Sequence, residues 1–218
     1  MTLGADGADG GDGGNSTTEA AGGQGGAGGQ GGSGVMKFEN SHIANSGFLQ
    51  LGGNGAKSGI DGTATGGTEA GSGGQGGSGG NGYALFKSGN GQIASNIVLG
   101  GTASEQDAAS GLAGSGQLTI EDGSFTANSL SIGQANTVNG SENQYLQTGG
   151  IFTTDRTEQH SGALRIKGGV FASALLEASK GLLEVTNQAT AIIGTRELNA
   201  ERWQQGATWM EQQQSTPF

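Results

Sequence analysis

Apolar residues recur at fixed offsets from a glycine in several short segments of the chain. The five segments start at Gly34, Gly82, Gly116, Gly162 and Gly181, and four positions after each glycine stand Phe38, Phe86, Ile120, Ile166 and Val185. Another apolar or small residue stands two positions after each glycine: Met36, Ala84, Leu118, Leu164 and Leu183. Alternation with one residue between is typical of a strand with one buried face. A second apolar cluster follows in the first four segments, so each segment is predicted to be a strand–turn–strand unit.

Such units are too short to bury a face alone, but stacking them in parallel would align their apolar positions and pair their backbones. The sequence therefore predicts an all-β fold, a short parallel β-helix (β-solenoid) of four to five coils over residues 34–194. The unit starts are 48, 34, 46 and 19 residues apart, so long insertions are expected at 54–81, 102–115 and 134–161. A β-sandwich with long loops is the alternative, although it does not require the same residue type at the same offset.

Glycine-rich runs precede the first two units. Gly-Gly-X repeats fill residues 22–34 and 73–82, and each run ends on the first glycine of a unit, Gly34 or Gly82. The chain has 49 glycines but one proline, which excludes collagen. Polyproline II has three residues per turn, so Gly-Gly-X leaves two bare rows along which backbones can approach. We expect polyproline-II-like insertions packed beside the solenoid, together with a Gly-rich N-terminal segment (1–33). A flexible linker is the alternative.

The last segment, 195–218, changes in character because Gln, Glu and Ala accumulate there. Ala200, Trp203, Ala207 and Met210 follow a helical spacing, which predicts a C-terminal helix that caps the solenoid. The alternative is a tail that docks on another protein through Trp203, Trp209 and Met210.

Composition narrows the function. The net charge is −10 with only nine Lys and Arg, which argues against a nucleic-acid partner. Cysteine is absent, which removes disulfides and thiolate chemistry. No apolar run approaches the ~20 residues that span a membrane, and the first residues carry no secretory signal. Leu, Ile, Val and Phe make up roughly 17% of the chain, which suits the thin core of a solenoid.

Candidate chemistry is sparse, and no cofactor is expected. Asp6, Asp9 and Asp12 recur every third residue and are weak Ca²⁺ candidates, with a solvated acidic start as the alternative. Ionisable residues also gather in the last insertion, where we expect a recognition loop formed by Asp155, Arg156, Glu158 and His160. A carboxylate pair there would suit glycoside cleavage, but no complete catalytic constellation is present, so the chain is not predicted to be an enzyme.

The stretch "GSGQLTIEDGSFTANSLSIG" (114–133) resembles the repeats of bacterial autotransporter passengers and related β-helical surface adhesins. "KFENSHIANS" (37–46) is similar to segments of polymorphic outer-membrane proteins, and the Gly-Gly-X insertions resemble those of large surface proteins and of some phage tail-tip adhesins. This resemblance implies an extracellular β-helix used for adhesion or structure and supplies no active-site residue.

The sequence thus predicts a non-enzymatic extracellular or cell-surface protein, either a self-assembling fibre subunit or an adhesin. Self-association or a larger surface or tail assembly is the expected partnership, with a glycan or host-surface ligand as a further partner. A phage tail-tip or fibre adhesin carried on the virion tail is the first alternative. A polysaccharide-cleaving β-helix enzyme that uses Asp155 or Glu158 is the second.

Overall fold

The computed structural model describes residues 1–15, 22–60, 62–63, 72, 74–103, 111–134, 142–186, 188–198, 202–205 and 208–211, without the side chains of 195–211. Within these ranges the chain is all-β and contains no helix. The strands are β1 (Thr2–Leu3), β2 (Gly34–Phe38), β3 (Ser41–Ala44), β4 (Phe48–Leu51), β5 (Gly82–Phe86), β6 (Gly89–Leu99), β7 (Gly116–Ile120), β8 (Ser124–Ile132), β9 (Gln144–Gln147), β10 (Ile151–Gln159), β11 (Ala163–Ile166), β12 (Gly169–Ala178), β13 (Leu182–Val185), β14 (Ala189–Leu198), β15 (Arg202–Gln205) and β16 (Thr208–Glu211).

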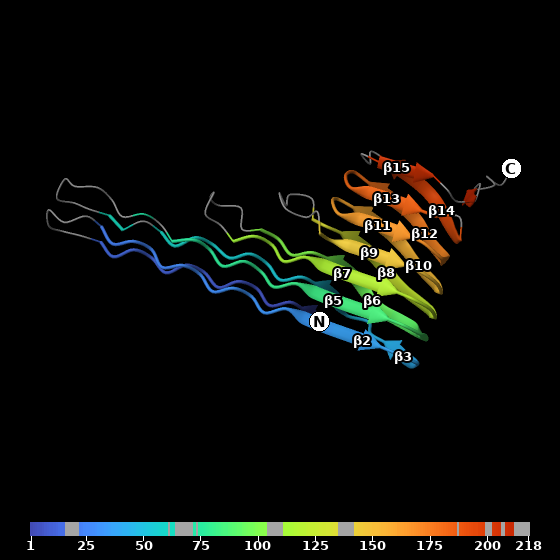
Figure 1. Cartoon of the computed structure of the whole chain (residues 1–218), viewed down its shortest axis with the longest axis horizontal. Helices are drawn as coiled ribbons and strands as arrows, with labels where there is room; N and C mark the ends of the chain where they lie inside the picture. Colours follow the sequence, from blue (N-terminus) through green and yellow to red (C-terminus); the bar gives the residue numbers. More distant parts are fainter. Residues whose placement is uncertain are drawn as a thin grey trace.

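The strands form two parallel sheets, between which the chain alternates (Figure 1). Within the described residues the large sheet has nine strands, in the order β1-β4-β6-β8-β10-β12-β14-β16 with β3 beside β6. The small sheet has seven, in the order β15-β13-β11-β9-β7-β5-β2. Except for β3 and β4, which follow one another in the large sheet, consecutive strands of one sheet are separated in sequence by a strand of the other. The chain therefore winds as a β-solenoid, as the sequence predicts.

The register of the small sheet reproduces the sequence repeat. Gly34 pairs with Gly82 and Gly82 with Gly116, and Phe86 lies between Phe38 and Ile120. The inward column is fully buried from Phe86 onward, and the rings of Phe38 and Phe86 stack with centroids 5.0 Å apart. Identical offsets in successive units thus become a ladder of contacts, which is how units that cannot bury a face alone acquire a common core.

The sequence pattern did not predict one of the coils. Residues 144–159, expected to lie in the insertion 134–161, form β9 and β10, and β10 pairs with both β8 and β12. The expectation was wrong because several inward positions of this coil are polar. Gln147, Thr154 and Thr157 are buried. Their hydrogen-bonding groups find partners inside the solenoid: the Tyr145 hydroxyl donates to Gln147 Oε1 (2.9 Å), and the Thr157 and Ser173 hydroxyls are 3.0 Å apart. Buried polar groups that are paired in this way are tolerated in a core.

The predicted C-terminal capping helix is wrong. The segment forms two strands instead: β15 extends the small sheet next to β13, and β16 extends the large sheet next to β14. The apolar spacing of 200–210 fits a helix as well as two short strands on either side of residues 206–207. Strands prevail because the edges of β13 and β14 expose backbone donors and acceptors, which an added strand satisfies and a helix does not.

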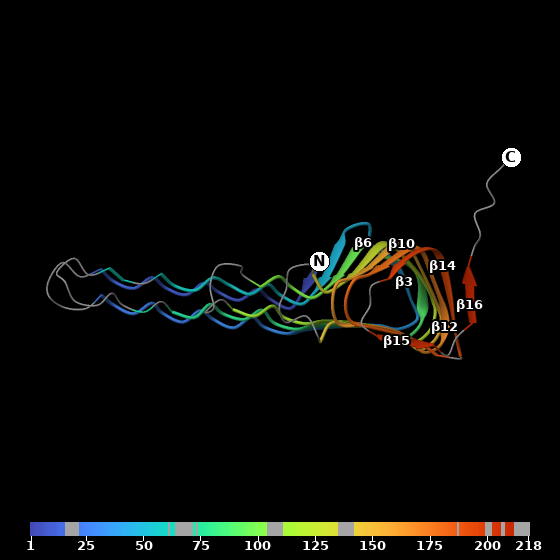
Figure 2. The same cartoon turned by 90° about the horizontal axis from the view of Figure 1, so that it is seen from above.

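Glycine-rich hairpins project from one side of the solenoid and form an elongated stalk (Figures 1 and 2). Each hairpin leaves the end of a large-sheet strand and returns to the start of the next small-sheet strand. We number the arms in chain order by their described residues: arm 1 (4–15), arm 2 (22–33), arm 3 (52–60 and 62–63), arm 4 (72 and 74–81), arm 5 (100–103) and arm 6 (111–115). Arms 3 and 5 begin at Gly52 and Gly100, where positive φ values of 103° and 106° turn the chain out of the sheet.

The arms are hydrogen-bonded to one another through their backbones. Within the first hairpin, Ala5 and Ala8 donate to the carbonyls of Gly32 and Gly29 (2.7 and 2.8 Å). Arms of successive hairpins are bonded as well, for example Gly28 N–H to the Gln75 carbonyl (2.7 Å). Outgoing arms form one layer and returning arms the other, as Figure 2 shows. The stalk therefore consists of two hydrogen-bonded layers of arms. Outgoing arms continue in the direction of the large-sheet strands, and returning arms run in the direction of the small-sheet strands.

Candidate functional site

The acidic residues of arm 1 connect the first hairpin to the second. Oδ1 of Asp6 accepts from the backbone N–H of Asn54 (2.6 Å), that of Asp9 from Lys57 (2.9 Å), and that of Asp12 from Ile60 (3.1 Å), each pair 48 residues apart. Asn15 continues the row by accepting from Thr63 (2.9 Å). These side chains therefore fix the register between arms 1 and 3.

This arrangement bears on the Ca²⁺ hypothesis. A Ca²⁺ ion needs six to eight oxygen ligands around one point. The three aspartates are instead spread along the arm, and each carboxylate is directed at a different backbone amide. In the described part of the chain, no three His, Cys, Asp or Glu side chains come together as metal ligands.

The predicted recognition cluster lies on a strand instead of a loop. Asp155, Arg156 and Glu158 belong to β10, and His160 follows it directly. Arg156 forms ion pairs with Glu158 (2.7 Å) and with Glu177 of β12 (2.5 Å), and His160 lies 4.0 Å from Glu158. The Glu158 charge, followed by the hydrogen bond to Glu177, raises the pKa of Arg156, so the guanidinium stays charged. The expectation of a loop was wrong because the polar inward residues concealed the strand.

The chemistry of this cluster is that of a surface ion-pair network. Arg156 holds the carboxylates of two neighbouring strands, and about half of its side chain is exposed (49%). Exposed pairs of this kind contribute little stability. Asp155 is exposed and lies where β10 skips one position in its pairing with β8 and β12.

The C-terminal docking candidates lie on the last strands. Trp203 pairs in register with Leu183, Trp209 with Ala191 and Met210 with Ile192. Leu183 and Ala191 are buried in the core. The tryptophans thus occupy positions that continue the inward columns of both sheets, which is where a capping element would be expected.

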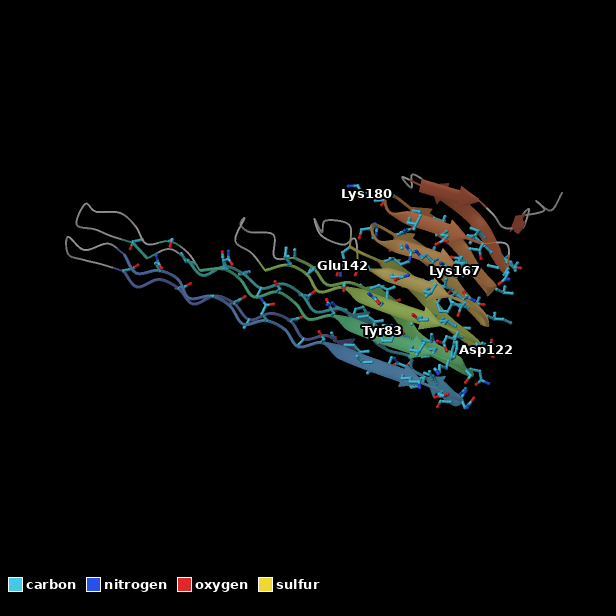
Figure 3. The ribbon with its side chains drawn as sticks, viewed as in Figure 1. Tyr83, Asp122, Glu142, Lys167 and Lys180 are labelled. Atoms are coloured by element: carbon cyan, nitrogen blue, oxygen red, sulfur yellow. The ribbon has the colours of Figure 1, made fainter. Side chains whose placement is uncertain are left out.

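A hollow of about 410 Å³ lies where the stalk meets the solenoid, beside Glu142 (Figure 3). Its lining includes Gln117, Gln144 and Arg165. Arg165 Nε lies 3.3 Å from Glu184 Oε2, so the guanidinium is paired with a carboxylate of the neighbouring strand β13.

The N-terminal edge of the molecule lies where both sheets end. We define it as β1, β2 and the outer sides of arms 1 and 2. β2 is the last strand of the small sheet and β1 the last of the large sheet. A hollow of about 500 Å³ lies between β1 and the ends of the two arms, lined by residues such as Leu3, Gly4 and Ser33.

Apolar side chains gather at this edge. Val35 is 75% exposed and Met1 61%, and Phe48 of β4 lies close by at 41%. The core column ends here in side chains that are only partly buried: Leu3, Met36, Phe38 and Ile43. Beyond this edge, the equivalent positions of later coils are covered by the next strands.

Backbone groups are also unpaired along this edge. In the described part of arm 1, neither the N–H nor the C=O of Asp6, Asp9 or Asp12 has a hydrogen-bonding partner. The equivalent groups of arm 3 are bonded: the Lys57 carbonyl accepts from Gly10 (3.0 Å) and its N–H donates to Asp9. Arm 1 therefore leaves unpaired the same N–H and C=O groups that, in arm 3, bind arm 1.

The opposite side of the stalk ends differently. Asn143 is 96% buried, and its Oδ1 accepts from the N–H of Gly116 (2.8 Å). In the preceding hairpins the corresponding glycines, Gly34 and Gly82, donate to backbone carbonyls of the next arm, at Asn81 and Ser115. At the base of the stalk on this side, a side chain therefore takes the place of the carbonyl that a further arm supplies in the preceding hairpins.

Sequence reasoning missed this edge, although a signal was present. Asp6, Asp9, Asp12 and Asn15 precede Asn54, Lys57, Ile60 and Thr63 by the same 48 residues that separate Gly34 from Gly82. Equal spacing in the insertions and in the coils predicts that the two hairpins are in register.

Comparison with protein-family models, with curated proteins and with solved structures gave no match. Among the described residues, no helix is long and apolar enough to cross a bilayer. The function must therefore be argued from the geometry of this chain.

Proposed function

We propose that this chain is a non-enzymatic structural or adhesive protein that acts outside the cell, at a cell surface, as a subunit of a larger assembly. The observation that carries the proposal is the continuous N-terminal edge. Strands β1 and β2, each paired on one side only, run directly into arms 1 and 2, whose outer backbone groups have no partner in the described chain, over a surface where apolar side chains gather. Open strand edges recruit further polypeptide unless they are blocked.

The stalk suits a structural role. Its hydrogen bonds recur at every third residue, which supports the polyproline-II conformation expected for Gly-Gly-X runs, with three residues per turn. Bonds between arms in both layers make the stalk a stiff spacer rather than a flexible linker. Such a spacer holds the solenoid at a fixed distance from whatever the far end of the stalk meets.

Composition supports an extracellular setting and a protein partner. The chain is acidic, has no cysteine and is rich in glycine. A net charge of −10 disfavours binding to a polyanion. The third-residue positions of the Gly-Gly-X runs at 22–34 and 73–82 are Gln, Ala, Ser and Asn, which are small or polar.

Electron microscopy of the purified chain tests this function, together with immunogold labelling of intact cells that produce it. Assembled particles whose proportion rises with protein concentration, and label on the outer surface of intact cells, are the expected results. Label found only after the cells are opened would contradict the proposed location. Isolated single molecules at the highest attainable concentration, with no adhesion to any surface, would contradict both the structural and the adhesive role.

A second candidate is a receptor-binding adhesin of a virion tail, with a glycan or host-surface ligand. The observation that favours it is the layered packing of the glycine-rich hairpins, which the resemblance to phage tail-tip adhesins leads one to expect. Binding of the labelled protein to intact cells tests it, with Arg156→Gln as a variant on the exposed face of β10. Saturable binding to particular cells supports this candidate, and its absence from a broad panel removes it.

A further inference from the structure

The N-terminal edge carries an inference about the identity of the partner, and this inference rests on the proposed function. We propose that the partner is a second copy of this chain, bound edge to edge about a two-fold axis that runs along the stalk. The contact would join arm 1 of each copy to arm 2 of the other, and β1 of each copy to β2 of the other.

The direction of the chain makes the edge self-complementary. Arm 1 runs away from the solenoid and arm 2 returns, and in the same way β1 runs toward the stalk and β2 away from it. Rotation by 180° about an axis along the stalk leaves these directions unchanged. It places the outgoing layer of one copy beside the returning layer of the other. Each arm and each edge strand therefore meets an antiparallel partner. A two-fold contact uses the same patch on both subunits, so a patch with this property closes as a dimer.

Antiparallel pairing of such arms already occurs within the chain. Ala8 of arm 1 donates to Gly29 of arm 2, Ala56 of arm 3 donates to Gly77 of arm 4, and Gly114 of arm 6 donates to Gly53 of arm 3. In each case an N–H of one arm reaches a carbonyl of an arm that runs the other way. The edge of arm 1 and the edge of arm 2 carry the same groups at the same three-residue spacing.

The acidic side chains of arm 1 leave this edge clear. The carboxylates of Asp6, Asp9 and Asp12 reach across to arm 3, away from the edge, because each accepts from an arm-3 amide. In arm 2, the third-residue positions are Gln24, Ala27, Gln30 and Ser33, and none of these residues makes a described hydrogen bond. The outward surface of arm 1 is therefore mainly backbone, which a second backbone can approach closely.

The solenoid end provides the apolar part of the contact. Met36 and Phe38 are only partly buried, although they continue the core column, and Phe38 stacks on Phe86. A second copy that continues both sheets covers these side chains and those of Leu3 and Ile43. Charge opposes the contact, since each copy carries −10, so we expect dimerisation to strengthen with salt.

Proline substitution in arm 2 tests the inference. Ala27→Pro with Gln30→Pro removes two N–H groups that have no partner within the described chain, and proline suits the polyproline-II backbone. The matched control, Ala27→Ser with Gln30→Ala, keeps both N–H groups. Because each substitution acts twice in a symmetric dimer, the proline variant is expected to weaken dimerisation by at least about a hundredfold. The control is expected to dimerise like the original chain. Sedimentation equilibrium from micromolar to near-millimolar protein measures both.

Amide hydrogen exchange of the unaltered chain gives a second readout, which does not depend on the folding of a variant. The amides of Asp9, Ala27 and Gln30 are expected to become protected as protein concentration rises. The amide of Lys57, bonded within the chain, is expected to be protected throughout.

A chain that stays monomeric at all concentrations overturns the inference. So does a dimer in which the arm-1 and arm-2 amides gain no protection, or one that the proline variant forms equally well. In the last two cases self-assembly still occurs, through another surface, and the proposed function survives the loss of this particular interface.

Discussion

The solenoid and the stalk belong to one chain, but they are held together in opposite ways. In the solenoid, side chains alternate with a period of two, and large ones such as Phe86, Phe125 and Tyr145 fill the space between the sheets without exposure to solvent. In the stalk the period is three, and backbone N–H and C=O groups join the arms where side chains are missing. Figure 3 shows this contrast as crowded side chains on the solenoid and sparse ones along the stalk.

The difference teaches which substitutions each region tolerates. Removing atoms harms a packed core because it leaves a cavity. Adding atoms harms a lattice of close backbones because nothing can move aside to make room. The same change in side-chain size therefore has opposite consequences in the two regions.

The largest effect is expected for Phe86→Ala in the solenoid. Phe86 is fully buried, stacks on Phe38 and meets Phe125 edge-on with ring centroids 5.2 Å apart. Its truncation is expected to lower the free energy of unfolding by about 3–5 kcal/mol, measured by urea denaturation. Phe48→Ala is the control, because that side chain is 41% exposed and its loss is expected to cost under about 1 kcal/mol. Equal losses from the two variants would contradict a core built on the inward column.

The converse change, the added methyl of Gly77→Ala in arm 4, is expected to destabilise the stalk. A Cβ at Gly77 would overlap the carbonyl oxygen of Gly29 and lie 2.9 Å from that of Ala8. We expect a loss of about 1–3 kcal/mol from overpacking, together with faster amide exchange in the neighbouring arms.

Gly32→Ala in arm 2 is the matched control, since a Cβ there meets no atom within 4 Å. This variant is expected to match the original chain in stability. If Gly77→Ala and Gly32→Ala behaved alike, the close packing of the arms would be disproved.

Sequence alone predicts much of this architecture, and the failures share a cause. The coils at Gly34, Gly82 and Gly116 are found because their inward residues are apolar. The coil at 144–159 was missed because Gln147 and Thr157 occupy inward positions, where each has a hydrogen-bonding partner in the next coil, Val170 or Ser173. A pattern of hydrophobicity cannot reveal a polar residue that is paired across strands.

The same limit applies to the candidate site and to the C-terminal segment. The aspartates of arm 1 suggested a cation because their ligand-like spacing is visible in sequence, whereas the amides that they bind lie 48 residues away. Trp203 and Met210 fit a helical stripe, but the register with β13 and β14 decides for strands. Tertiary pairing overrides local spacing in both cases.

The smallest effect is expected from the residues that set the register of the stalk. Asp9→Ala removes the acceptor of the Lys57 amide (2.9 Å) at an exposed position, so a loss of about 0.5–1.5 kcal/mol is expected, with faster exchange at Lys57. Asp9→Asn keeps an oxygen in the same place and is expected to restore slow exchange, although it removes the charge. If Asn failed where Asp succeeds, charge and not the hydrogen bond would hold the arms together. If neither variant changed the exchange of Lys57, the backbone bond from Gly10 to Lys57 would be sufficient to hold arms 1 and 3 together. The side chains of the stalk would then be dispensable, unlike those of the solenoid core.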